Sequence, residues 1–162
     1  MKDSQPRLSK SPDFAILVAA AYGVVASRLL AAMEGAGIAG MRPAYGFVIR
    51  AVAAESPTIN RLAELLGVSK QAASKLADDM HRAGFLERSE DTEDRRHTRL
   101  TLSRKGKAVF TRALRVSRSM ERSLRARAGS KDVDAFLRVL TAFIEQHGLL
   151  EDVLARRARP VL

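Results

Sequence analysis

Two short amphipathic segments separated by a glycine-containing turn constrain this chain more than any other feature. Apolar residues recur at helical spacing in residues 60–66 and again, at intervals of three and four, in residues 70–82. These positions are Leu62, Leu65 and Leu66 in the first segment and Ala73, Leu76, Ala77 and Met80 in the second. Between the segments, Gly67 allows the left-handed backbone of a sharp helix exit, and Ser69 is a strong N-cap. With Thr58 as the cap of the first segment, the pattern predicts a helix-turn-helix.

The residues after this pair change from helical to alternating periodicity. Gly84 ends the second segment, and residues 85–88 begin a short strand. Residues 98–102 alternate as a returning strand does, and the polar run 89–97 between them is too charged to lie in a core. We therefore expect a β-hairpin, or wing, directly behind the second helix.

The start of the second helix carries a polar and basic outer face suited to duplex DNA. Ser69 and the first backbone amides can hold a phosphate at the helix N-terminus. Gln71 and Ser74 can reach base edges, and a bidentate pair of Gln71 with adenine would contribute about 1–3 kcal/mol of discrimination. Lys70 and Lys75 would contact phosphate, or guanine if they turn inward. The helix alone does not separate this interpretation from an ordinary amphipathic helix with a solvated polar face.

The wing offers a second candidate contact. Arg95 or Arg96 is placed to enter the minor groove, where a narrow A·T-rich tract concentrates negative potential. Asp94 would be repelled by phosphate, so we expect it to orient a neighbouring arginine. The alternative is a solvated, charged hairpin tip.

Four runs in this order and spacing resemble the MarR family of transcriptional regulators. They are LAELLGVS at 62–69, GFLER at 84–88, DTEDRR at 91–96 and LTLSRKG at 100–106. The resemblance implies a mainly α fold with a small β-hairpin wing, a winged helix-turn-helix whose N- and C-terminal helices form a dimer interface. The family's wing carries the same Asp-then-Arg pattern, which favours DNA contact by Arg95 or Arg96.

The N-terminal segment independently favours a homodimer. Residues 14–33 are mostly apolar, with Arg28 the only charge, so this helix is expected to be buried on more than one side. A monomer of 162 residues has little interior to hide it. We expect Ser11 to cap this helix, Pro12 to take its first position and Asp13 to complement its dipole.

Further helices are expected at 43–55, at 104–128 after a Ser103 cap, and from a Ser130 cap to Gly148. The chain then divides into three parts. Residues 1–55 hold the N-terminal dimerisation helix and a linking helix, 56–103 form the DNA-binding region, and 104–162 hold the long connecting helix and the C-terminal dimerisation helices.

The net charge of +10, from 28 basic and 18 acidic residues, invites a polyanionic partner. Residues 56–102 nevertheless balance at 8 basic and 8 acidic residues, whereas 103–129 hold 9 basic residues against Glu121 alone. Of this basic stripe, Arg104, Lys105 and Lys107 are placed to touch flanking phosphates. The remainder, Arg115 to Arg125, is expected to be a solvated face, with membrane-surface binding and an anionic effector site as alternatives.

Several function classes find no support in the sequence. There are no cysteines, the three histidines have no ligand spacing, and no nucleophile elbow or phosphate-binding glycine loop is present. We expect no enzyme activity, no metal and no cofactor. The polar start is not a signal peptide, and the apolar run from Phe14 to Val25 is too short to span a bilayer. The prediction is a cytoplasmic protein with no membrane partner.

The prediction is therefore a sequence-specific homodimeric repressor on a pseudo-palindromic double-stranded DNA operator, with half-sites about one helical turn apart. The resemblance implies release by a small aromatic or anionic effector bound between the dimerisation and DNA-binding parts, where Tyr45 and Arg50 are candidate ligand contacts. Alternatives are a ligand-independent activator, a sequence-neutral nucleoid-type protein, and an interaction protein that has lost DNA binding.

Overall fold

The computed structural model describes residues 13–90 and 98–148, and this part is mainly helical with one antiparallel hairpin. Its elements in chain order are α1 (Phe14–Glu34), α2 (Pro43–Glu55), α3 (Ile59–Leu66), α4 (Lys70–Arg82), β1 (Leu86–Glu90), β2 (Thr98–Leu102), α5 (Arg104–Ala128) and α6 (Ser130–Gln146). The predicted fold class is confirmed.

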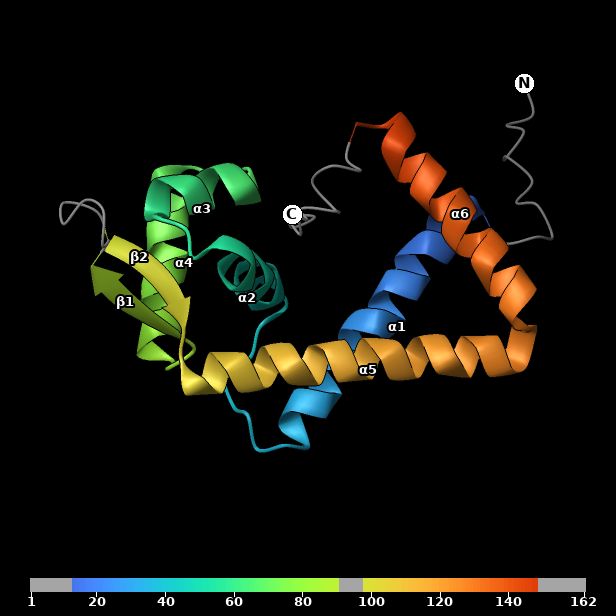
Figure 1. Ribbon diagram of the computed structural model, residues 1–162, viewed down its shortest axis with the longest axis horizontal. Helices are drawn as coiled ribbons and strands as arrows, with labels where there is room; N and C mark the ends of the chain where they lie inside the picture. Colours follow the sequence, from blue (N-terminus) through green and yellow to red (C-terminus); the bar gives the residue numbers. More distant parts are fainter. Residues whose placement is uncertain (1–12, 91–97, 149–162) are drawn as a thin grey trace, which may run out of the picture.

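The long helix α5 joins two groups of elements (Figure 1). At its start lies a lobe made of α2, α3, α4 and the β1–β2 hairpin. Helix α1 crosses α5 near its middle, and α6 turns back from the far end of α5 towards α1. The rings of Phe14 on α1 and Phe143 on α6 meet edge to face, with their centroids 5.3 Å apart.

The hydrophobic core lies in the lobe at the start of α5. Its largest fully buried side chains come from all of the surrounding elements, including Val48, Leu62, Met80, Phe85 and Leu100. Val109 brings α5 into the same core. The lobe is thus a packed unit that holds α4 rigidly against α2, α3 and the hairpin.

The turn between α3 and α4 forms as the sequence predicts. Thr58 Oγ1 accepts a hydrogen bond from the Arg61 amide at 3.3 Å, and Ser69 Oγ accepts one from the Ala72 amide at 3.2 Å. Gly67 ends α3 with a left-handed backbone, φ 66°. The short cap-to-cap turn fixes the angle at which α4 leaves α3.

The hairpin is longer than expected at its first strand. Register pairs run from Leu86 opposite Leu102 to Glu90 opposite Thr98, so Ser89 and Glu90 belong to β1 and not to the wing loop. The ladder continues because both residues find backbone partners on β2. A further bond from the Leu100 amide to the Pro57 carbonyl, 2.9 Å, ties the hairpin to the segment before α3.

Two helix starts differ from the predictions. Asp13 is the N-cap of α1 and accepts from the Ala15 amide at 2.7 Å, so it lies outside the helix rather than in its first turn. The predicted cap, Ser11, lies outside the described residues. At α6 the chain turns at Gly129, φ 86°, so Ser130 is already the first helical residue and makes no side-chain cap.

Helix α1 is the most exposed apolar element of the described part. Phe14, Ile16 and Val24 are 61%, 65% and 59% exposed. The helix has 21 residues with a mean hydropathy of 2.0, long and apolar enough by length and composition to cross a membrane. The expected limit at Val25 is therefore wrong, because the apolar run continues beyond Ser27 and Arg28. Core helices of soluble proteins pass the same test, so length alone does not assign α1 to a bilayer.

Candidate nucleic-acid interface

The five residues predicted to contact DNA from the second helix lie together at the start of α4. Lys70, Gln71 and Lys75 are exposed, Ser74 is half-buried, and Ser69 is the exposed N-cap. The opposite side of α4 is buried through Ala73, Ala77 and Met80. The fold thus holds one face of α4 in the core and leaves the polar face open to a ligand.

The two aspartates of α4 are each paired with an arginine. Asp78 forms an ion pair with Arg88 on β1, and Asp79 forms one with Arg82 one turn further on α4. Because they are adjacent in a helix, the two residues point to different sides of it. These pairs offset the acidic charge of α4, which we call the reader helix. The Asp78–Arg88 pair links this helix to the first strand of the wing.

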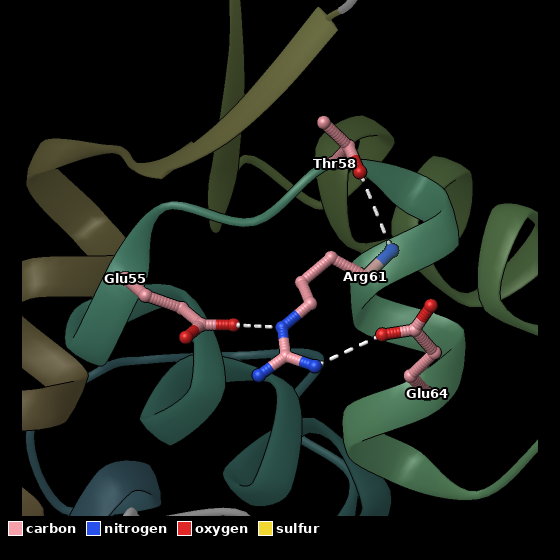
Figure 2. A network of polar contacts seen from close by, with 4 residues as sticks. All are labelled: Glu55, Thr58, Arg61 and Glu64. Atoms are coloured by element: carbon pink, nitrogen blue, oxygen red, sulfur yellow. Dashed lines mark hydrogen bonds and ion pairs between the residues drawn. The ribbon is translucent and has the colours of Figure 1, made fainter.

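A polar network joins α3 to the end of α2 (Figure 2). Because α4 packs on α3, this network also helps to fix the position of α4. Arg61 Nε donates to Glu55 at the end of α2 at 2.7 Å, and its Nη1 donates to Glu64 at 2.9 Å. Hydrogen bonds to Glu64 and then Glu55 raise the pKa of Arg61 above its ordinary value. The guanidinium therefore remains charged throughout the physiological pH range.

The wing contacts predicted at Asp94, Arg95 and Arg96 lie outside the described residues. The two strands that lead to them are described, and they emerge beside α4 (Figure 1). Pairing of β1 with β2 and the Asp78–Arg88 ion pair fix where the wing departs from the lobe.

The basic stripe of α5 separates into three kinds of residue. Arg104, Lys107, Arg115, Arg118 and Arg122 are exposed. Arg125 instead pairs with Glu121 and Asp134, and the hydrogen bond that it donates to Asp134 is the largest cause of its raised pKa. Lys105 is half-buried, and its ammonium donates to backbone carbonyls of Ala83 and Ala39, so it is not turned outward towards flanking phosphate.

A largely apolar cavity of about 280 Å³ lies between α1, α2 and α5. Its polar lining includes Tyr22, Arg42 and Arg50. Tyr45, the other candidate ligand contact, does not line it, because its side chain is buried in the core and its ring packs edge to face on Phe85 at 5.7 Å. Residues 13–90 and 98–148 contain no group of three or more His, Cys, Asp or Glu placed to hold a metal ion.

Residues 39–97, which span α2 to the wing, match the model of the MarR family. This region resembles the DNA-binding part of the MarR family of transcriptional regulators. The match covers the helix-turn-helix and the polar face of α4. The candidate DNA-contacting residues of α4 therefore lie in the part of the chain that carries the family pattern.

Solved structures of MarR-like fold align with most of this chain. The transcriptional regulator Tm0710 of Thermotoga maritima is 23% identical, with a TM-score of 0.59 over 83% of this chain and 95% of its own. MarR of E. coli is 16% identical, with a TM-score of 0.59 over 83% and 99%. The Mycobacterium tuberculosis MarR family protein Rv2887, solved with salicylic acid, is 21% identical, with a TM-score of 0.58 over 84% and 99%. These identities establish the fold alone. No curated protein matches the sequence.

The sequence did not indicate the roles that the structure gives to three residues. Arg61 and Lys105 act through partners on other elements, Glu55 and the Ala39 carbonyl, which periodicity does not reveal. Arg42 lines the cavity and lies over the Tyr45 ring, 5.7 Å from its centroid. Its position at the N-cap of α2, where a Ser or Thr would be a better cap, was the one available signal.

Proposed function

We propose that this protein is a cytoplasmic homodimeric repressor of the MarR family that binds a pseudo-palindromic operator and is released by a small anionic aromatic ligand. The observation that carries the proposal is the face of α4 that presents Lys70, Gln71 and Lys75 outward while Ala73 and Ala77 anchor it in the core. A helix held in this way enters a major groove with its first turns against the bases.

Dimerisation is supported by the uncovered apolar surfaces at the far end of α5. Besides α1, helix α6 exposes Phe136, Leu137, Val139 and Phe143. The two helices adjoin through the Phe14–Phe143 contact, so their apolar side chains belong to one region. An exposed apolar region of this kind is typical of an interface, and a second copy of the chain is the occupant we propose. The two α4 helices would then lie about 34–36 Å apart, one turn of DNA.

The test of sequence-specific binding is selection of duplexes from a random pool, followed by fluorescence anisotropy with the enriched and scrambled duplexes over a salt series. A specific regulator prefers the enriched duplex by about a thousandfold or more, and the enriched sequence contains an inverted repeat. Equal affinities that vanish together as salt rises would instead indicate a sequence-neutral, charge-driven protein.

Gln71→Ala is the sharpest variant for this test. If Gln71 reads a base edge, the variant loses roughly ten- to hundredfold in affinity for the enriched duplex and nothing for scrambled DNA. Thr111→Ala, at an exposed position of α5, is the control and leaves both affinities unchanged. An equal loss on both duplexes would assign Gln71 to phosphate contact or to folding.

Ligand release is supported by the cavity between α1, α2 and α5. Its apolar walls suit a ring, and Arg42 and Arg50 supply cationic groups for an acidic substituent. Because the cavity lies between the dimerisation helix α1 and the lobe, a bound ligand would alter the spacing of two reader helices in a dimer. A ligand that fits only the altered spacing favours release from the operator.

The probe for this step is sodium salicylate, chosen because the relative Rv2887 was solved with salicylic acid. We expect it to lower the anisotropy of the bound operator, with a weaker response in Arg50→Met. Arg28→Met, on α1 but outside the cavity lining, is the matched control. Release that is unchanged in Arg50→Met, or absent for salicylate and related aromatic acids, would contradict the assignment of the cavity.

The three-part division at residues 55 and 103 stays a prediction. The boundaries fall beside the ends of α2 and β2, but α2 packs in the same core as α3, α4 and the hairpin. In the proposed mechanism, α2 therefore moves with the DNA-binding region.

A further inference from the structure

Three segments that are distant in sequence meet at the start of α5. The first is the turn that follows α4, at residues 83–85, and the second is the first turn of α5. Ser103 Oγ donates to the Gly84 carbonyl at 2.6 Å, and the Ser103 amide donates to the Phe85 carbonyl at 3.1 Å. The third is the loop between α1 and α2, residues 35–42, which passes α5 near its start (Figure 1).

The side chain of Lys105 joins all three segments. Its Nζ donates to the Ala83 carbonyl at 2.9 Å and to the Ala39 carbonyl at 3.2 Å. The same ammonium lies 4.1 Å from the centroid of the Phe85 ring. Ala83 is the C-cap of α4, so the cation also sits at the negative end of the reader-helix dipole.

The loop that Lys105 holds borders the cavity. Met41 and Arg42 line the cavity two and three residues beyond Ala39. Ile38 and Met41 of the loop pack against the core, whereas Gly37 and Gly40 adopt φ 70° and 79° with nothing near the position of a Cβ. Ala39 lies between the two packed residues, and the hydrogen bond from Lys105 fixes its carbonyl from outside the loop.

We propose that Lys105 is a positioning residue that couples the α1–α2 loop to the carboxyl end of the reader helix. Immobilising α4 on DNA fixes the Ala83 carbonyl, and through the shared ammonium it restrains Ala39 and the loop. By the same linkage, a displacement of the loop shifts the end of α4. The proposal rests on DNA binding by α4 and not on ligand release, and its test uses no effector.

The experiment is hydrogen–deuterium exchange of the full-length protein, free and saturated with an enriched duplex, with anisotropy used to verify saturation. In the wild type, DNA is expected to slow amide exchange in residues 35–42 as well as in α4. Lys105→Met keeps the aliphatic stem and removes the ammonium. We expect it to speed exchange of the loop on the order of tenfold in the free protein and to abolish the DNA-dependent slowing there, while α4 remains protected.

Two variants separate coupling from charge and from folding. Arg118→Met removes an exposed charge farther along α5, and we expect it to keep the DNA-dependent slowing of the loop. Lys105→Arg retains donors for both carbonyls and is expected to restore it. If Lys105→Met does not fold, Lys105→Gln takes its place, because the shorter amide cannot bridge both carbonyls. Loop protection by DNA in Lys105→Met equal to that in the wild type, its absence in the wild type, or an equal loss in Arg118→Met would overturn the proposal.

Discussion

Gly106 shows how closely α5 approaches the turn after the reader helix. A Cβ built on Gly106 would lie 2.2 Å from the Phe85 carbonyl oxygen and 3.3 Å from Leu102. The nearest atom belongs to the backbone, so it cannot turn away as a side chain could. The glycine in the run LTLSRKG is therefore required by close contact and not by a left-handed backbone.

Gly106→Ala is accordingly expected to destabilise the protein by about 1–3 kcal/mol, although alanine is the better helix former. Gly46→Ala in α2 is the matched control, since nothing lies within 4 Å of its Cβ position. The control should be neutral or stabilise by up to about 1 kcal/mol. Urea unfolding at one fixed protein concentration measures the stability of both variants. Equal stabilities of the two variants would show that the contact between Gly106 and the Phe85 carbonyl relaxes freely.

Local sequence rules predicted the residues whose roles are local. Thr58, Gly67, Ser69 and Ser103 perform the capping and turning roles assigned to them, because those roles depend on neighbours within a few residues. Tyr45 shows the opposite case. Its position in α2 did not reveal that the Phe85 ring, 40 residues away, would take it into the core and away from the cavity.

At the scale of elements, the Arg61 network connects α2 with α3. Arg61→Met is expected to cost about 1 kcal/mol of unfolding free energy, a modest value because the side chains of Arg61 and Glu55 are each more than a third exposed. A double-mutant cycle with Glu55→Gln should give a coupling of a few tenths of a kcal/mol or more. Strict additivity would show that the bridge between the helices contributes nothing.

The reader helix and the basic stripe of α5 should differ in their salt response. Lys70→Met and Lys75→Met are each expected to reduce the slope of log affinity against log salt by about 1, since each removes one phosphate contact. Arg118→Met removes the same charge from an exposed position on α5 and should leave the slope unchanged. An equal reduction by Arg118→Met would place the stripe on DNA.

The boundaries of α3, α4 and α5 were predictable because caps and glycines mark them, and those of α2 because Pro43 begins it and Pro57 follows its end. Those of α1 and α6 were less so, since Asp13 competes as a cap with Ser11, and Gly129 leaves Ser130 inside the helix. The length of β1 is set by its pairing with β2. The alternation of residues within one strand does not predict how far that pairing extends. Residues 91–97, with the predicted wing arginines, lie outside the described part.

At the scale of the whole molecule, the proposed dimer can be tested at the exposed apolar side chains of α1. Ile16→Asp together with Val24→Asp places charges at positions 65% and 59% exposed in the isolated chain, so the fold of the lobe should be unaffected. We expect this variant to be monomeric by light scattering and to lose a hundredfold or more in operator affinity, because the two half-sites are no longer linked. Asn60→Asp, exposed on α3, is the control for dimerisation. A dimer that survives the double substitution would place the interface elsewhere.

The position of α1 in the chain also has a consequence for synthesis. Translation must add about 70 residues after Glu34 before α5, on which α1 packs, begins at Arg104. At about 5–20 residues per second this takes roughly 4–14 s. During that interval a nascent chain carries the apolar helix α1 without α5, the helix on which α1 packs. Neighbouring ribosomes on the same message hold the nearest identical helices, so for the proposed homodimer this order of elements favours pairing of two chains before their release from the ribosome.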